Sequence, residues 1–408
     1  MHILAGESAL RALRAVRSRG IPVWLPYPDC EQRCVLLPGQ SPEGADGTQP
    51  DSACPAEQDE ASRAEEPTLA KDGFAFDKAE THARVELFRL GDVGRFTKER
   101  PLELAVFDYG HRTTRKKSRT RVLPRNLPAS ALIKVDPGLY FVCPELIVLE
   151  LAPRMTPTGL SQVIMELCGT YSLHPNPDAA EGASYNLDPV TTLWRIGQYG
   201  KRVRSRGGTD VLRRALAMAM EGSASPSETK LAIMMSLPRE QGGYELGRPV
   251  LNGRITVPDE FHDFVDGRVY YPDAFWQEAY VDMEYQSTEF HLDPLAAMAL
   301  VPAPRPHADT VPEANAARAQ RQEFITKQDA DLCRMRELGL LGVNVVPVTS
   351  FDLKTVHRMD QIACILAREH ARAGGLDWET WQSDLAEQEY REARESLLRE
   401  LNGTGDLA

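Results

Sequence analysis

Apolar and polar residues in the first half of the chain follow spacings typical of short helices and strands, with one long polar interruption. Residues 7–19 place apolar side chains on one face of a helix, whereas residues 38–71 contain few bulky apolar residues. We therefore expect an N-terminal helix, a flexible solvated loop and then a small α+β domain. The other elements predicted here are strands at 103–110 and 129–142 and helices at 145–152 and 156–169.

The second half begins with helical patterns and continues with strands and helices in turn. Thr209 or Asp210 is the expected N-cap of a hinge helix, and Ser225, followed by Pro226, is the expected N-cap of the next one. The order from there on is helix, three strands, helix, strand, helix, which indicates an α/β fold, or α+β for the whole chain. The predicted helices are 209–223, 225–238, 319–339, 354–374 and a charged one at 377–401, and the strands are 254–257, 268–276, 279–285 and 343–350.

The chain of 408 residues is longer than one hydrophobic core usually supports, so we expect several domains. A polar, Pro-rich stretch from 175 to 189 indicates a linker, and another from 302 to 314 indicates an insertion. The expected division is an N-terminal segment with an acidic loop (1–73), a small α+β domain (74–174), a basic linker with the hinge helix (175–222), an α/β domain (223–373) and a charged C-terminal helix (374–408).

Charge and cysteine content narrow the class of protein. The formal net charge of -12 argues against a uniformly basic nucleic-acid-binding surface, so any contact with nucleic acid must be local. The seven Cys residues lack the spacing of a metal site, and no apolar run reaches the length of a membrane helix. We therefore expect reduced thiols, no membrane partner and a cytoplasmic location.

Carboxylates in the predicted hairpin of the second half are candidates for metal chemistry. Asp273 ends an apolar strand, and Glu284 and Gln286 project from one face of the next strand. Pairing of these strands brings Asp273 and Glu284 within reach of a common Mg²⁺ or Mn²⁺ ion. Glu228 has two interpretations of equal weight, as a further metal ligand or as the partner of Ser225 in a capping box.

Four runs together resemble the endonuclease-like domain related to very-short-patch repair endonucleases, of the PD-(D/E)xK kind. They are SASPSETKLAIMMSLPREQGGY (223–244), YYPDAFW (270–276), VDMEYQSTEFH (281–291) and VNVVPVTS (343–350). The resemblance implies a restriction-endonuclease-like mixed sheet flanked by helices, with Asp273 and Glu284 as metal ligands.

The sequence departs from the pattern of that family at the position of its usual Lys, where Gln286 stands. Gln286 can orient water but brings no positive charge. His291 is either a general acid or phosphate contact, or a structural or surface residue.

Two basic segments, 111–121 and 201–206, are candidates for contact with DNA phosphates. The alternative for the first is a solvated loop or an edge strand protected by its charge, and the alternative for the second is pairing with the acidic stretch 43–66. A region at 104–174, with VDPGLYFVCPELIVLELA and MELCGTYS, loosely resembles abortive-infection antitoxin-like regulators. The candidate DNA-binding residues are Arg115, Lys116, Lys117, Arg119, Lys201, Arg202, Arg204 and Arg206.

These observations lead to three hypotheses of function. The first is a Mg²⁺-dependent DNA phosphodiesterase acting through Asp273 and Glu284. The second is a catalytically inactive DNA-binding regulator or antitoxin-like protein that reuses the nuclease fold, and Gln286 is its main support. The third is a protein that binds a partner through its charged C-terminal helix.

Overall fold

The computed structural model shows a mixed α/β chain that divides into two compact units. The first unit takes in the described residues up to Ile233, apart from Cys34–Val35, together with residues 399–403. The second takes in Cys34–Val35 and the residues from Met234 to Leu398. The residues that the structure describes are 2–19, 34–35, 95–112, 115–124, 126–136, 139–176, 182–203, 207–286, 326 and 329–403.

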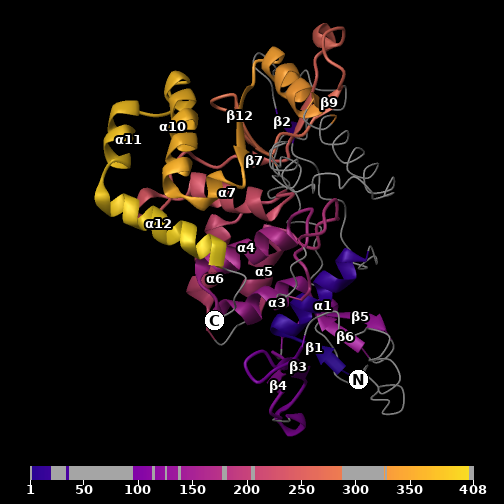
Figure 1. The fold of residues 1–408 in the computed structure, drawn as a ribbon. Coiled ribbons are helices and arrows are strands. Elements are labelled where there is room, and N and C mark those ends of the chain that lie inside the picture. The colour runs from indigo at the N-terminus through magenta and orange to yellow at the C-terminus, as the bar shows by residue number, and fades with distance from the viewer. Residues whose placement is uncertain are drawn as a thin grey trace, which may run out of the picture. The chain divides into compact units, whose positions relative to one another are not determined.

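A five-stranded mixed sheet with the order β4-β3-β1-β6-β5 organises the first unit (Figure 1). Its central strand β1 comes from the start of the chain and runs antiparallel to β3 and parallel to β6. Ile3 and Leu4 of this strand are buried. The strands are β1 (His2–Leu4), β3 (Leu102–Val106), β4 (Ser118–Val122), β5 (Leu132–Asp136) and β6 (Leu139–Val142).

The helices of the first unit pack around α3, which is apolar along most of its length and contacts α1, α4 and α5. Pro144 is the first residue of α3, and the Thr156 hydroxyl caps α4 by accepting from Gly159 N at 3.1 Å, so the helices predicted at 145–152 and 156–169 are both present. The helices are α1 (Gly6–Ser18), α3 (Pro144–Leu151), α4 (Pro157–Leu167), α5 (Leu193–Arg202) and α6 (Thr209–Met218), and α7 (Pro226–Ser236) continues into the second unit.

The predicted N-cap of the hinge helix was wrong. Gly208, not Thr209 or Asp210, precedes the first helical residue, with φ +77°. A Cβ at this position would lie 2.6 Å from Pro153 N, so both the backbone conformation and the close approach require glycine. The sequence pattern shows the helix but not the neighbouring backbone that fixes where it begins.

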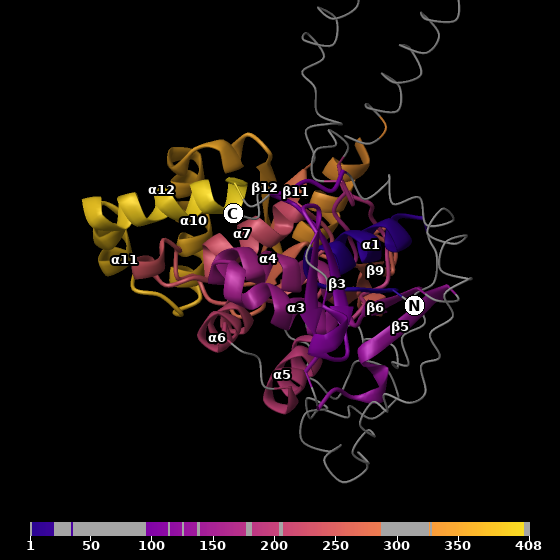
Figure 2. The ribbon, with the colours of Figure 1, turned by 90° about the horizontal axis from the view of Figure 1, so that it is seen from below.

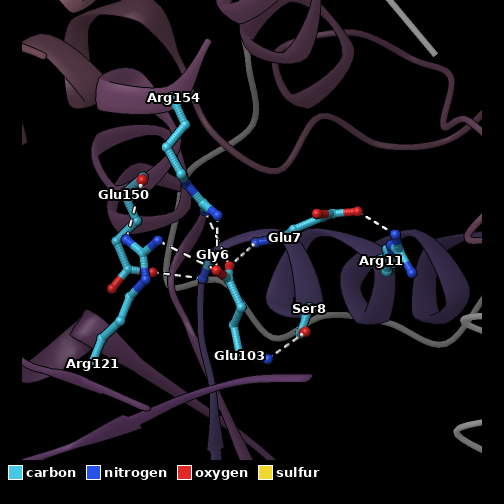
Figure 3. A network of polar contacts seen from close by, with 8 residues as sticks. All are labelled: Gly6, Glu7, Ser8, Arg11, Glu103, Arg121, Glu150 and Arg154. Atoms are coloured by element: carbon cyan, nitrogen blue, oxygen red, sulfur yellow. Dashed lines mark hydrogen bonds and ion pairs between the residues drawn. The ribbon is translucent and has the colours of Figure 1, made fainter. Parts of the chain in front are cut away.

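A buried carboxylate joins the sheet of the first unit to the start of α1 (Figure 3). Glu103 on β3 accepts from Glu7 N at 2.9 Å, and two arginines surround it: Arg154 at 2.7 and 3.0 Å and Arg121 at 3.3 Å. Burial alone would raise the pKa of Glu103, but the charges of Arg154 and Arg121 outweigh it and lower the pKa. The ionised carboxylate therefore fixes both the strand and the helix N-terminus.

The second unit is built on a four-stranded sheet with the order β12-β11-β10-β7. Strand β10 pairs antiparallel with both β7 and β11, and β11 pairs parallel with β12. The crossover between β11 and β12 includes a helix at 329–340, where a helix was predicted. The strands are β7 (Val250–Leu251), β10 (Ala274–Trp276), β11 (Val281–Gln286) and β12 (Asn344–Thr349), and a separate sheet contains β2 (Cys34–Val35), β8 (Arg254–Thr256) and β9 (Val269–Tyr270).

Helices α11 and α12 lie beside α10, which packs against the sheet of the second unit (Figures 1 and 2). Trp276 at the end of β10 meets His370 of α10 edge to face, with ring centroids 5.9 Å apart. The Trp381 indole donates to Tyr244 O at 2.9 Å, and Tyr244 OH donates to Asp360 at 2.8 Å. These helices are α10 (Val356–Arg372), α11 (Trp378–Leu385) and α12 (Gln388–Gly403).

Two predicted elements of the second half need correction. The single strand expected over 268–276 is two strands in different sheets, because Pro272 between them has no N–H to continue a ladder. The strand predicted at 254–257 is present as β8 and belongs to the smaller sheet, while β7 lies beside β10. The C-terminal helix is likewise two helices, and Arg394 Nη2 donates to Leu385 O at 2.8 Å where the first one ends.

Several sequence expectations fall outside the described residues. They are the solvated loop at 38–71 with its acidic stretch, the insertion at 302–314, and the residues His291, Arg204 and Arg206. Among the residues that are described, no helix has the length and apolar character needed to cross a membrane.

Glu150, beside the Glu103 network, gives a test of its energetics. Its carboxylate accepts from Gly6 N at 2.6 Å, yet burial raises the pKa of Glu150 to about 7 from an ordinary value of 4.5. A raised carboxyl pKa means that folding stability is fully present below the unfolded pKa and is lost as pH rises towards the folded pKa.

We predict that Glu150→Gln, which keeps an acceptor for Gly6 N, raises the free energy of unfolding by about 2 kcal/mol above pH 7. The gain is expected to shrink in acid, because wild-type Glu150 is then protonated. Urea unfolding above pH 7 and in acid measures the difference in the free energy of unfolding between variant and wild type. A Glu150→Gln variant that is less stable than the wild type above pH 7 contradicts the raised pKa of Glu150.

Candidate functional site

The β10–β11 hairpin brings Asp273 and Glu284 together, as predicted. Phe275 pairs with Asp282 and Trp276 with Val281, so continuing this register by two residues places Asp273 opposite Glu284. The Asp273 side chain itself reaches the neighbouring strand, because Tyr285 N donates to Asp273 Oδ2 at 2.7 Å. Both carboxylates therefore lie at one edge of the hairpin.

Asp282 is a third carboxylate of this site, which sequence reasoning missed. It lies on the same face of β11 as Glu284 and is fully buried. Its Oδ1 accepts from Ala274 N at 3.3 Å, while its Oδ2 has no hydrogen-bond partner among the described residues. Burial, followed by the charges of Glu284 and Asp273, raises the pKa of Asp282 well above its usual range.

Arg334 provides the positive charge of the site, and it comes from the helix at 329–340. Its Nη2 and Nε lie 2.7 and 3.2 Å from Glu284 Oε1, and its guanidinium also donates to Tyr271 O. Burial works against the charge of Arg334, but Glu284, with help from Asp273 and Asp282, raises its pKa. The site thus contains three acidic side chains and one persistent cation.

Gln286 ends β11, where it pairs in register with Thr349 of β12. It shares the face of Asp282 and Glu284 by alternation, as predicted, and is partly exposed. The side-chain amide of Gln286 therefore lies at the more exposed end of the row that begins at the buried Asp282.

Glu228 lies in α7 and forms the predicted capping interaction. Its N donates to Ser225 Oγ at 3.1 Å, and its carboxylate accepts from Ala224 N at 2.9 Å, one residue before the reciprocal partner expected of a capping box. The capping role of Glu228 is observed, whereas its role as a metal ligand stays a prediction. Glu228 belongs to the first unit and the hairpin to the second.

The candidate DNA-binding residues that the structure describes all lie in the first unit. Those of the first basic segment are in and before β4 and are exposed, as is Lys201 near the end of α5, while Arg202 is half-buried. The exposed side chains of the first segment are Arg115, Lys116, Lys117 and Arg119.

The residues of the hairpin suit a hard divalent cation in their chemistry but are not closed around one. Carboxylate oxygens are the preferred ligands of Mg²⁺, and a buried oxygen without a partner, Asp282 Oδ2, is available for coordination. Within the described residues, however, no three or more His, Cys, Asp or Glu side chains form a ready-made metal cluster. Arg334 engages Glu284 through Oε1, so an ion bound by Glu284 would share this carboxylate with the guanidinium.

Comparison with known proteins gives no assignment. No family model matches the chain, and neither the curated proteins nor the solved structures gave a significant match. The site therefore has to be judged on its own geometry and chemistry.

We predict that Asp282→Asn stabilises the protein at neutral pH by at least about 1 kcal/mol, because a buried carboxyl with a raised folded-state pKa favours the unfolded chain, where it ionises freely, and an amide does not. The new amide keeps the acceptor for Ala274 N and can donate to Glu284. Chemical unfolding at neutral and acid pH measures the effect, which should fade in acid. Exposed Asp263→Asn is the matched control, and a destabilised Asp282→Asn variant at neutral pH contradicts the assigned ionisation.

Proposed function

We propose that the chain is a metal-dependent DNA phosphodiesterase whose site comprises Asp273, Asp282 and Glu284. The observation that supports this best is the burial of Asp282 beside two further carboxylates on paired strands. Folding does not favour such a group of like charges, and strongly perturbed carboxylates of this kind cluster at functional sites.

The topology of the second unit supports the same proposal. Strands β7, β10 and β11 are antiparallel neighbours, and a crossover containing a helix leads to the parallel strand β12, followed by α10. Such a mixed sheet with helices is what a restriction-endonuclease-like fold of the PD-(D/E)xK kind would have. In that fold Asp273 and Glu284 occupy the metal-binding positions.

Each side chain has a task in this proposal. Asp273, Asp282 and Glu284 would hold Mg²⁺ or Mn²⁺, and a bound ion supplies Lewis acidity and a more acidic water. Gln286 would orient water through its amide. Arg334 would release Glu284 and donate to a phosphate oxygen of the DNA instead. Arg334 would thus supply the charge that Gln286 lacks, while the exposed candidate DNA-binding residues of the first unit would hold the DNA backbone.

Cleavage of supercoiled and single-stranded DNA tests the proposal directly. With Mg²⁺ or Mn²⁺ we expect nicking that EDTA abolishes and that Glu284→Gln and Asp273→Asn each reduce by at least about 100-fold, as loss of a metal ligand does. Exposed Glu260→Gln is the matched control and should cleave like the wild type. Cleavage that persists in both ligand variants would mean a contaminating nuclease and exclude this site.

A second candidate function is a catalytically silent, DNA-binding regulator. The observation in its favour is the ion pair between Arg334 and Glu284. It engages the carboxylate proposed to bind the metal, in a site that already lacks the usual Lys. DNA binding that is indifferent to metal, without cleavage by any variant, would favour this function over the enzyme.

Arg334→Ala separates the two tasks of the guanidinium. We expect Mg²⁺ affinity to rise several-fold, because Glu284 is released and a nearby positive charge is removed, while DNA cleavage falls by about 10-fold or more. Calorimetric Mg²⁺ titration and a nicking assay measure these effects. Exposed Arg336→Ala on the same helix serves as control, and unchanged metal affinity in Arg334→Ala would exclude competition between Arg334 and the ion for Glu284.

A further inference from the structure

A cavity of about 710 Å³ lies in the first unit, well away in the chain from the carboxylate hairpin. One wall comes from β4 and the segment 107–112, and the other from α3 and the 3₁₀ turn η5 (Ala152–Arg154) that follows it. Its volume is in the range of pockets that bind small molecules.

Two arginines of this cavity are available for a ligand. Arg112 and Arg119 are exposed, and among the described residues no carboxylate forms an ion pair with either. The other charged residues of the cavity already have partners: Arg121 binds Glu103 at 3.3 Å, and Asp108 accepts from Gly110 N at 3.0 Å and contacts His111 (Figure 3 shows Arg121). The cations of the cavity that no described carboxylate engages are therefore Arg112 and Arg119.

Glu150 also lines the cavity, and its carboxylate is engaged by the backbone. Its Oε2 accepts from Gly6 N at 2.6 Å, on the α1 side of the network in Figure 3. Arg121 also donates to Glu150 O at 3.4 Å. An anion can thus bind at Arg112 and Arg119 without competing with an established ion pair of either residue.

The cavity also offers flat and apolar surface beside the cations. The Tyr109 ring is 56% exposed, and the Arg112 guanidinium carbon lies 5.8 Å from its centroid. Leu146 and Leu149 of α3 form an apolar wall with Phe107. An exposed aromatic ring next to arginines is the surface on which a nucleobase stacks while its phosphate meets guanidinium groups.

We propose that this cavity binds a nucleoside monophosphate group, with the phosphate at Arg112 and Arg119 and the base against Tyr109 and the apolar wall. The proposal stands independently of the metal site. The group can come from a free mononucleotide or from the 5′-phosphorylated end of a DNA strand, since both present one phosphate beside one base.

Titration calorimetry with AMP, GMP, adenosine and inorganic phosphate tests the cavity on the full chain. A mononucleotide should bind at least about 10-fold more tightly than adenosine or phosphate alone, because only it engages both halves of the cavity. Arg119→Ala and Tyr109→Ala should each weaken binding by about 10-fold. Exposed Lys98→Ala, which changes a cation outside both the cavity and the candidate DNA-binding residues, should leave the binding unchanged.

Fluorescence anisotropy of a short oligothymidylate, with and without a 5′-phosphate, then identifies the source. If the 5′-phosphorylated strand binds more tightly and Arg119→Ala removes this preference, the ligand of the cavity is a strand terminus. If mononucleotides bind but the strand shows no such preference, the ligand is a free nucleotide. No binding of any probe overturns the proposal. Equal weakening by Lys98→Ala and Arg119→Ala also overturns it, because general charge attraction then explains the binding. Tyr109→Ala, a change at an exposed side chain, keeps the test valid if Arg119→Ala fails to fold.

Discussion

Strand β11 is hydrogen-bonded to β10 on one side and to β12 on the other, and this double pairing fixes which acidic and amide side chains lie together at the candidate site. Because successive side chains of a strand alternate between faces, the register decides that Asp282, Glu284 and Gln286 share one face while Val281 and Met283 are buried on the other. A slip of one residue would exchange the two sets. The chemistry of the hairpin therefore follows from backbone pairing, and the tight turn that ends at Tyr280, with φ +47°, sets that pairing.

Glu103 of the first unit and Asp282 of the second are both buried carboxylates, but their surroundings differ in charge. The charges of Arg154 and Arg121 outweigh the effect of burial on Glu103, so its pKa falls and its charge holds β3 to α1. Burial raises the pKa of Asp282, and the charges of Glu284 and Asp273 raise it further. Neutralised buried acids are ordinary structural elements, whereas an acid buried among other acids is found where binding or proton transfer requires it.

The sequence pattern was sufficient for most helices and strands and for part of the site. Local signals such as Pro144 at a helix start and alternation in β11 act over a few residues and were correct. Asp282 had a local signal too, since it stands two residues before Glu284 and on the same face. Arg334 had none, because its contact with Glu284 spans 50 positions and depends on how a helix packs.

The errors also have physical causes that lie outside local patterns. Gly208 was overlooked as a cap because the backbone of Pro153, distant in sequence, requires it. The strand at 268–276 was predicted as one element because apolar composition continues through Pro272, although the hydrogen-bond ladder cannot. The metal, DNA and regulator hypotheses remain proposals, since a side-chain arrangement shows what chemistry is available and not which substrate is used.

The place of β1 in the first sheet has a consequence for how this unit folds. Its neighbours β3 and β6 begin only at Leu102 and Leu139, so this central strand pairs with segments that are distant in sequence. Contacts of such long sequence separation require large loops to close before any hydrogen bond of the pair can form, and sheets dominated by them fold slowly. The apolar side chains of β1 therefore stay unpaired until the rest of this sheet has assembled around them.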